Sequence, residues 1–315
     1  MSELEDDVAI LTALLSIDFQ STSLFDDMII ELSSQMYICA SDSSITTDIL
    51  HEAMNYSLGL RGKYARGLLV LLVMTGWNKP WRSAIYCAKA VEMVHTASLI
   101  IDDLPSMDNA SLRRGKATNH TKFGEPISIL TAISLLSEAF KLLASCPELN
   151  AEQRHLAVTC LASSIGLNGM SSGQMRDLVS LKTEIADIEL THALKTGTLF
   201  AKAAELGCIA ANVSGEQKWL LSDFGMQLGK AFQELDDIID VATVSKSTGK
   251  DTSKDTSKPT IVAILGIKKA EQRAIKQVAK ALDCLKSSTA KKSHLRQFTL
   301  NLTRAMLAMI HSLED

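Results

Sequence analysis

The sequence contains few of the residues that interrupt helices. Its 315 residues include five prolines and 16 glycines, and aromatic side chains make up only 5%. A fold of short strands and tight turns needs more of these residues, so a β-rich architecture is disfavoured. The six cysteines are scattered, with no Cys-x-x-Cys pair, and therefore indicate neither a zinc cluster nor a disulfide framework. We expect them to be reduced thiols in the interior.

An excess of basic charge is also missing. The chain carries 32 Lys and Arg against 36 Asp and Glu, a net charge of −4, which disfavours a nucleic-acid-binding domain. The acidic first residues are unlike a signal or transit peptide, and we find no apolar run of the roughly 18 residues that a membrane span needs. The 46% hydrophobic and 22% charged content is that of a folded globular protein. We therefore expect a cytoplasmic protein with no membrane span and no nucleic-acid partner.

What the sequence does contain is long segments in which apolar residues recur with helical spacing. The clearest are residues 83–101, 127–144, 190–213 and 219–241. Several are apolar on more than one side, as helices are when other helices surround them, and none alternates with the two-residue period of a strand. Turn-forming residues separate these segments at 76–80, 105–126, 146–151 and 213–215. The sequence predicts one all-α domain over residues 1–315, with an exposed polar loop at 250–258.

Two clusters of aspartates lie in apolar helical surroundings. The first comprises Asp102, Asp103 and Asp108, and the second comprises Asp236, Asp237 and Asp240. Asp236 and Asp240 are one helical turn apart, where two like charges cost an isolated helix roughly 0.2–0.5 kcal/mol. Carboxylates clustered in this way suit Mg²⁺, which is usually held by one or two carboxylates, water and phosphate oxygens. Taken singly, either cluster is also explained as a solvated acidic face, since unpaired carboxylates are mostly exposed.

Pro105 divides the first cluster. Asp102 and Asp108 are six residues apart, which a continuous helix would place about 240° apart around its axis. We therefore expect the helix to end before Pro105, so that the helix end and the following turn bring three carboxylates around one metal-bound diphosphate. The sequence has neither a P-loop nor a Gly-x-Gly-x-x-Gly phosphate cradle. Any phosphate chemistry then depends on side chains and metal.

Basic residues flank the first cluster on both sides. Lys63 and Arg66 lie well before it, and Arg113 and Arg114 follow it closely. Arg offers a planar fork to phosphate oxygens, and Lys offers a point charge. Taken alone, each is more often a surface charge. His95 lies seven residues before the cluster on the same helical face, although a lone helical His is ordinarily a core or surface residue.

The order and spacing of these residues resemble the trans-isoprenyl diphosphate (polyprenyl) synthase family. The matching segments are Gly62-Lys63-x-x-Arg66, the run from Glu92 to Asp108, Arg113-Arg114-Gly115, Gly173-Gln174-x-x-Asp177, Lys195-Thr196-Gly197 and Phe232-Gln233-x-x-Asp236-Asp237-x-x-Asp240. The four residues between the acidic pair and the last aspartate of the first cluster resemble the bacterial carotenoid-type geranylgeranyl diphosphate synthases in particular. The resemblance implies an all-α bundle of roughly ten or more helices around a central cavity, the isoprenoid synthase fold.

The resemblance also implies an activity and roles for individual residues. The activity is that of a Mg²⁺-dependent prenyltransferase of isoprenoid biosynthesis, a homodimer that condenses dimethylallyl, geranyl or farnesyl diphosphate head-to-tail with isopentenyl diphosphate. Three Mg²⁺ ions are implied, held by Asp102, Asp103, Asp108, Asp236, Asp237 and Asp240. The implied site for isopentenyl diphosphate is Lys63, Arg66, His95 and Arg114. The residues implied to contact the allylic diphosphate are Arg113, Lys195 and Lys250. The residues implied to act in catalysis are Asp102, Asp103, Lys195, Thr196, Gln233 and Asp236, with Gln233 also beside the substrate. Gln174 and Asp177 match a Gln-x-x-Asp near the metal region.

Product length is predicted from the helix that ends at Asp102. An apolar tail growing along this helix advances about 5.4 Å, one turn, per isoprene unit. Ala97 and Ser98 are small where fifteen-carbon synthases of the family typically carry an aromatic residue, and Met93 is a candidate floor. We therefore expect a twenty-carbon product, geranylgeranyl diphosphate. Small residues here are also explained by close helix packing, which leaves a farnesyl or longer-chain product open.

The chain departs from the family pattern without losing an implied metal or diphosphate ligand. The departing residues are Tyr64 for Arg, Gly67 for Pro, Ala117 for Pro, Ile133 where Gly-Asp is common, and Ser253 for Gly. Two rival interpretations remain. A non-catalytic regulatory subunit would not need the intact acidic clusters, and a terpene cyclase would leave the basic residues before the first cluster unexplained.

Overall fold

The computed structural model describes residues 23–38, 49–60, 62–179, 184–248 and 260–314, so the predicted loop at 250–258 and Lys250 lie outside the described residues. The first half of the described chain forms α2 (Ser23–Gln35), α3 (Ile49–Leu58), α4 (Ala65–Gly76), η1 (Trp81–Ala84), α5 (Ile85–Asp102), β1 (Leu112–Arg113), β2 (Lys116–Ala117), α6 (Asn119–Phe123), α7 (Glu125–Ala144) and α8 (Ala151–Ile165). The second half forms α9 (Met170–Leu178), α10 (Ile185–His192), η2 (Ala193–Gly197), α11 (Thr198–Ala210), α12 (Gly215–Thr248), α13 (Ile261–Leu265), α14 (Ile267–Lys286) and α15 (Ser293–Glu314). The predicted all-α class is confirmed.

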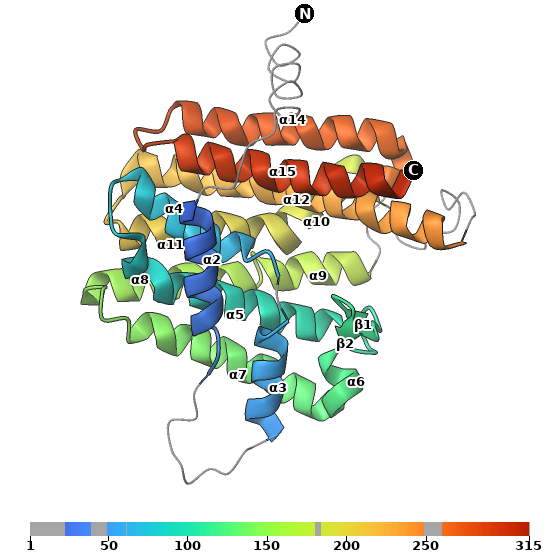
Figure 1. The fold of residues 1–315 in the computed structure, drawn as a ribbon, viewed down its shortest axis with the longest axis horizontal. Helices are drawn as coiled ribbons and strands as arrows, with labels where there is room; N and C mark the ends of the chain where they lie inside the picture. The colour runs from blue at the N-terminus through green and yellow to red at the C-terminus, as the bar shows by residue number, and fades with distance from the viewer. Residues whose placement is uncertain (1–22, 39–48, 61, 180–183, 249–259, 315) are drawn as a thin grey trace, which may run out of the picture.

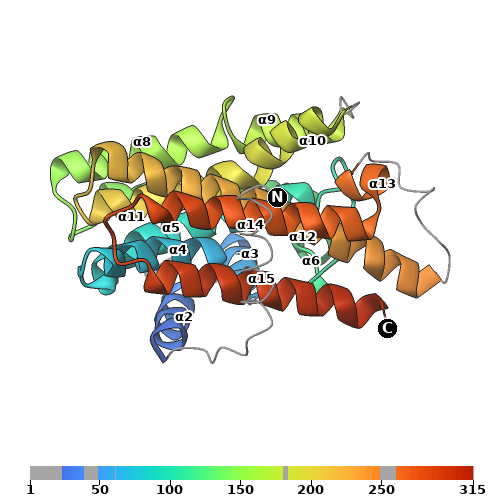
Figure 2. The ribbon, with the colours of Figure 1, turned by 90° about the horizontal axis from the view of Figure 1, so that it is seen from above.

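The helices are stacked in layers. In Figure 1, α14 and α15 lie at the top, α12 runs beneath them, α4 and α11 follow, and α5 and then α7 complete the stack. Figure 2 shows the same helices from above, with α14 and α15 side by side. The C-terminal ends of α5 and α12 both point toward the side of the molecule that carries the β1–β2 hairpin, on the right in Figure 1. The two aspartate clusters are therefore delivered to the same side of the stack.

The two helices at the centre of the stack, α4 and α11, are buried on all sides. Every residue of α4 except Thr75 is buried, and so is nearly all of α11. Neither helix has a polar face to turn toward water, which is the pattern expected of helices that are surrounded by other helices. Their sequences explain why: α4 reads Ala-Arg-Gly-Leu-Leu-Val-Leu-Leu-Val-Met-Thr-Gly. α4 packs against α5 and α11, and α11 in turn packs against α12.

Two glycines let α12 approach the helices beneath it. A Cβ added at Gly229 would lie 2.7 Å from Cα of Gly197, and one added at Gly225 would lie 2.6 Å from the backbone oxygen of Phe200. Both distances are too short for a real side chain, so these positions require glycine. The close approach places the next turns of α12, which carry Gln233 and the second aspartate cluster, directly beside η2.

The predicted helices are present, with two differences in detail. Segments 127–144 and 219–241 fall within α7 and α12, whereas 190–213 is divided by the π-helical turn η2 into α10 and α11. The predicted break at 105–126 contains an unpredicted antiparallel pair, β1 with β2. Its turn residues Arg114 and Gly115 have φ angles of 52° and 73°, as a two-residue hairpin turn requires. Strands of two residues are too short to show an alternating pattern.

Two helices are long and apolar enough for a membrane span by length and composition, as buried core helices also can be, although neither contains a continuous apolar run of that length. The stretch Trp81–Asp102, which includes α5, and α7 both meet that criterion by length and composition. Their polar residues are mostly uncharged, which is why the segments remain hydrophobic without a continuous apolar run. The apolar stretch is 61% buried in Trp81–Asp102 but 33% buried in α7. In α7 the exposed large side chains are Ile129, Leu130 and Ile133.

Candidate functional site

The first aspartate cluster lies where α5 ends. Asp102 is the last residue of the helix and Asp103 its C-cap, and the following turn brings the backbone N–H of Asp108 to 2.9 Å from the carbonyl oxygen of Asp102. Asp103 is 3% exposed and accepts hydrogen bonds from Arg113 Nε at 2.8 Å and Nη2 at 2.6 Å. The predicted end of the helix before Pro105 is confirmed. Arg113, on β1, fixes the buried carboxylate of this turn.

The second aspartate cluster lies inside the uninterrupted helix α12. Gln233 Nε2 donates to Oδ1 of Asp237 at 2.8 Å, and Nε2 of His192, at the end of α10, lies 3.2 Å from Oδ2 of the same carboxylate. Asp236 is half-buried and Asp240, one turn later, is exposed. Asp237 is therefore held from two sides, while Asp236 and Asp240 present their carboxylates along one face of the helix.

The two clusters share one electrostatic environment. Burial raises the pKa of Asp102 to about 6, helped by Asp108 and Asp103 and opposed by Lys195 and Arg113. The side chain of Asp240 is exposed at the surface of α12, but neighbouring groups partly desolvate its carboxyl group and raise its pKa to about 6, and the charges of Asp236, Asp237 and also Asp108 of the first cluster add to this effect. Burial and Asp237 raise the pKa of Asp236 as well. Carboxylates of both clusters thus repel one another across the site.

This donor set fits a hard divalent cation. The ligating atoms are carboxylate oxygens, which Mg²⁺ prefers, and their mutual repulsion is relieved by positive charge. Within the described part of the chain, no three His, Cys, Asp or Glu side chains form a group that could hold a metal ion on their own. The assignment of the six aspartates as metal ligands stays a prediction.

Lys195 and Thr196 lie together on the π-helical turn η2, between the two clusters. Lys195 Nζ pairs with Oδ2 of Asp177 at 2.8 Å, and its charge acts on Asp102. Thr196 Oγ1 donates to Oε1 of Gln233 at 2.5 Å. Single π-helical turns inside longer helices are frequent at functional sites. Here the turn directs two successive side chains toward helices α9 and α12.

Gln174 and Asp177, the predicted Gln-x-x-Asp, behave differently. Asp177 is occupied by Lys195, whereas both polar atoms of the Gln174 amide are buried and find no hydrogen-bond partner among the described residues. The neighbouring Gly173 lets α9 pack closely against η2. A Cβ at this position would lie 2.3 Å from the backbone nitrogen of Lys195, so no residue other than glycine fits there.

The predicted isopentenyl diphosphate residues form a second basic group. Arg66 is 7% exposed, and its guanidinium lies 4.5 Å from the ring centre of Phe200. Lys63 Nζ lies 5.7 Å from the ring of Phe232, and the charge of Asp236 acts on both basic side chains. The structure therefore brings Lys63 and Arg66 beside the second aspartate cluster.

Arg114 and His95 complete this group. Arg114 Nη1 donates to the carbonyl oxygen of Leu60 at 2.5 Å, and its guanidinium occupies the space that a Cβ at Gly62 would need. Burial lowers the pKa of His95 well below its usual value, and Arg66 and Arg114 lower it further. This shift favours the uncharged imidazole of His95, which lies among the arginines.

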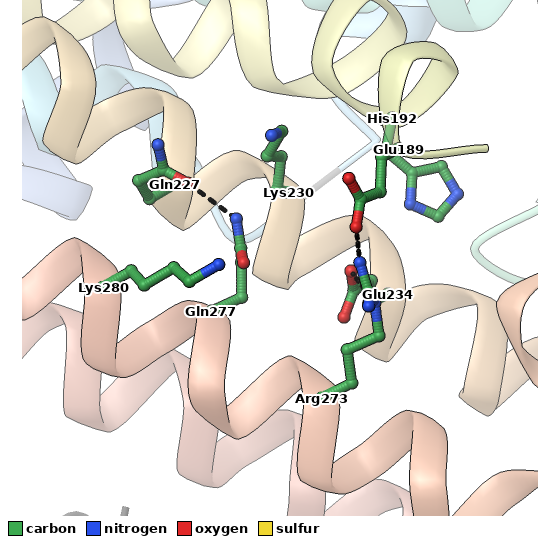
Figure 3. Close-up of a pocket in the computed structure, with 8 residues that line it drawn as sticks. All are labelled: Glu189, His192, Gln227, Lys230, Glu234, Arg273, Gln277 and Lys280. Carbon is green, nitrogen blue, oxygen red and sulfur yellow. Dashed lines mark hydrogen bonds and ion pairs between the residues drawn. The ribbon is translucent and has the colours of Figure 1, made fainter. Parts of the chain in front are cut away.

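Sequence reasoning did not find the polar cavity on the side of α12 that faces α10 and α14. Figure 3 shows this cavity, of about 230 Å³, with Arg273 of α14 directed toward Glu189 of α10 and Glu234 of α12. His192, which holds Asp237, also lines it. One signal was available, since Glu234 is a charged residue on the buried side of an amphipathic helix. Its partners come from other helices, so no local pattern reveals them.

Comparison with known proteins gives a consistent result. The sequence profile of the family described as Polyprenyl synthetase matches residues 47–299. A geranylgeranyl diphosphate synthase of Pantoea ananas is 39% identical over 230 residues, 72% of this chain and 75% of the relative, and a farnesyl diphosphate synthase of Micrococcus luteus is 37% identical over 76% of this chain and 83% of the relative. A Helicobacter pylori geranyltransferase, solved with magnesium and isoprenyl diphosphate, is similar with a TM-score of 0.76 and 26% identity, covering 94% of this chain and all of the other. With the fold and the two aspartate clusters in place, these matches show that the chain belongs to the polyprenyl synthetase family.

Proposed function

We propose that the protein condenses an allylic diphosphate head-to-tail with isopentenyl diphosphate and that its main product is geranylgeranyl diphosphate. The observation that carries this proposal is the meeting of two aspartate clusters with two separate basic groups at one side of the helix stack. One basic group, Arg113 and Lys195, acts on Asp102, and the other, Lys63 and Arg66, lies beside Asp236. Two anionic substrates need two such groups.

The allylic substrate binds between the aspartate clusters in this proposal. Mg²⁺ bound there, three ions as the family resemblance implies, supplies positive charge that offsets the charge growing on the departing diphosphate. Arg113 and Lys195 contribute further positive charge from the protein itself. The hydroxyl of Thr196 and the amide of Gln233, joined to each other at 2.5 Å, offer oxygen atoms to the allylic carbocation. The reaction needs no side-chain nucleophile.

Isopentenyl diphosphate binds at the second basic group. Arg66 and Arg114 pair with its diphosphate, and neutral His95 donates or accepts one hydrogen bond there. The aromatic rings of Phe200 and Phe232, 5.6 Å apart, lie beside Arg66 and Lys63 and exclude water from the apolar end of the substrate. The double bond of isopentenyl diphosphate then attacks the carbocation, and the released diphosphate accepts the proton.

The twenty-carbon product depends on small residues along α5. Ala97 and Met93 are each 1% exposed and packed in the core, whereas Ser98 is half-buried and donates a hydrogen bond back to the carbonyl oxygen of His95. The growing tail therefore has more room at Ser98 than at Ala97. We propose that the tail passes Ser98.

Substitution of Ser98 by Phe tests this assignment. Ser98→Phe should shift the main product from twenty to fifteen carbons, because an aromatic ring blocks the next turn of the helix. Ala97→Phe, its neighbour in the packed core, should instead lower stability, since extra volume in a dense core typically costs about 1–3 kcal/mol. Product chromatography and thermal unfolding of both variants separate the effects. An unchanged product from both variants contradicts a channel along α5.

The central experiment is incubation of the purified protein with Mg²⁺, isopentenyl diphosphate and dimethylallyl, geranyl or farnesyl diphosphate in turn. We expect isopentenyl diphosphate to be consumed with each primer and a twenty-carbon diphosphate to accumulate. Primer consumed without isopentenyl diphosphate would indicate a cyclase, and no consumption at all would indicate a regulatory subunit. A mainly fifteen-carbon product would place the chain with the farnesyl diphosphate synthases that it also resembles.

The cytoplasmic location and the homodimer remain part of the proposal. The observation that supports the homodimer is the exposed apolar side of α7, where Ile129, Leu130 and Ile133 are 42%, 49% and 56% exposed. Adjacent exposed apolar side chains of this size are typical of surfaces that contact another protein.

A further inference from the structure

The N-terminus of α4 rests on a carboxylate from another helix. The first turn of any helix leaves backbone N–H groups without partners inside the helix. Tyr64, at the N-cap of α4, is not one of the short polar residues that usually satisfy them, and its φ angle of 47° is left-handed. Instead, the backbone N–H of Gly67 donates to Oε1 of Glu92, in the middle of α5, at 2.7 Å. This hydrogen bond is buried and connects residues 25 apart in the chain.

Glu92 lies among the basic residues of the proposed isopentenyl diphosphate site. It is 5% exposed. Burial raises the pKa of its carboxyl group, while the backbone N–H of Gly67 and the charges of Arg66 and Arg114 oppose this effect, and the backbone N–H of Arg66 adds a smaller contribution. His95 follows three residues later on the same face of α5. The carboxylate thus supports α4 from behind at the position where Arg66 leaves it.

Gly67 is what makes this arrangement possible. It stands where the resembled family usually has proline, and a proline has no N–H to donate. A Cβ at this position would lie 3.0 Å from Cγ of Glu92 and 2.6 Å from Cδ2 of Leu32. Glycine therefore supplies the donor and also lets the carboxylate come close.

We propose that Glu92 is a positioning residue that fixes the first turn of α4, and with it the guanidinium of Arg66, for binding of isopentenyl diphosphate. The inference rests on the proposed function and extends it to a residue outside the substrate contacts. Arg66 has a buried Nε without a hydrogen-bond partner among the described residues, so its own side-chain contacts do not fully fix it. The hydrogen bond from Gly67, the next residue, to Glu92 sets where the side chain of Arg66 begins.

A charge-balancing role and a positioning role of Glu92 predict opposite effects of Glu92→Gln on the binding of isopentenyl diphosphate. If Glu92 only balances the arginines, removing its negative charge leaves the site more positive and binds the anionic substrate more tightly. If it positions α4, the neutral amide oxygen of Gln accepts the N–H of Gly67 more weakly than the carboxylate does, because hydrogen bonds to charged groups are the stronger ones. The first turn of α4 is then held less firmly, and we expect KM for isopentenyl diphosphate to rise about tenfold. KM for the allylic substrate should stay unchanged.

Glu92→Asp keeps the charge but shortens the side chain by one methylene. A positioning role predicts a rise in KM for isopentenyl diphosphate here too, whereas charge balance alone predicts wild-type behaviour. The matched control is Glu205→Gln, another buried carboxylate, held by Lys202 and Ser222 at 2.7 Å each within α11 and α12. It should lower thermal stability without separating the two KM values.

The measurements are KM for each substrate, kcat, and calorimetric binding of isopentenyl diphosphate alone to wild type and variants. A selective loss of isopentenyl diphosphate affinity in both Glu92 variants supports the inference. Tighter or unchanged binding in Glu92→Gln, or equal changes in both KM values, overturns it. A wild-type protein that consumes no isopentenyl diphosphate overturns the proposed function instead, so the two failures are distinguishable.

Discussion

The two aspartate clusters reach the same site from different kinds of backbone. The first lies at the C-terminal end of α5, where the helix dipole is unfavourable to a carboxylate, and continues into a turn. The second lies within the continuous helix α12, where the repulsion is between side chains one turn apart. Asp103 of the first is 3% exposed and paired with Arg113, while Asp240 of the second is exposed.

This difference shows two ways of holding negative charge in place. The first cluster depends on an arginine from a hairpin, so its geometry is tied to the backbone of residues 112–117. The second depends on the amide of Gln233 and the imidazole ring of His192, which hold Asp237. We therefore expect the first cluster to be the more costly to disturb, although both are needed for the same step.

The largest effect is expected on kcat, and it shows whether the two clusters contribute equally to catalysis. Asp102→Asn and Asp236→Asn should each lower kcat by about 10²–10³-fold, the loss typical of removing one group that stabilises charge in a transition state. Steady-state kinetics with saturating Mg²⁺ and both substrates measures this. The control is Asp223→Asn, earlier on α12, which accepts from Gln227 on the outside of the helix. A loss confined to one cluster would contradict a shared role.

The next effect concerns stability. Arg113→Ala should lower the free energy of unfolding by about 3 kcal/mol, because it leaves the carboxylate of Asp103 buried without its partner. His192→Ala should cost about 1 kcal/mol, the usual value of one hydrogen bond, since Asp237 keeps its bond to Gln233. Urea unfolding without metal compares the two. Equal losses of unfolding free energy would show that the two clusters are held equally firmly, which would contradict the greater cost expected for the first cluster.

The smallest effect sharpens the account of repulsion within α12. Asp240→Asn should raise the free energy of unfolding of the metal-free protein by about 0.3–0.5 kcal/mol at neutral pH, because it removes a like charge four residues from Asp236. Added Mg²⁺ with inorganic diphosphate should stabilise the wild type more than this variant. The thermal unfolding midpoint is measured in EDTA, where the variant should be more stable than the wild type, and with Mg²⁺ and diphosphate, where the wild type should gain more. A less stable variant in EDTA would contradict the repulsion.

Much of the fold followed from local pattern. The helical spacing of apolar residues located α7 and α12, and Pro105 marked the end of α5, because these features act within one or two turns. The aspartate and basic motifs were likewise visible as residue types at fixed spacing. Their meeting at one side of the stack depends on helix packing, which the resemblance implied and the structure describes.

Other features had no local signal. The pairing of Lys195 with Asp177 and the contact of His192 with Asp237 join residues from different helices. Glu92 appeared in the sequence as part of a motif, but its contact with Gly67 depends on how α4 crosses α5. The strands of the β1–β2 hairpin are too short to show an alternating pattern of apolar and polar residues. The π-helical turn adds one residue to an otherwise regular helical pattern.

That added residue has a consequence for how this chain tolerates change. An α-helix advances about 100° per residue, but a π-helical turn takes up one extra residue within the turn, so α10 and α11 keep nearly the faces that a regular helix without that residue would give them. Deleting one residue between Ala193 and Gly197 would therefore change the turn itself, where Lys195 and Thr196 contact α9 and α12, more than the packing of the flanking helices. The extra residue is thus a requirement of the site rather than of the helix stack.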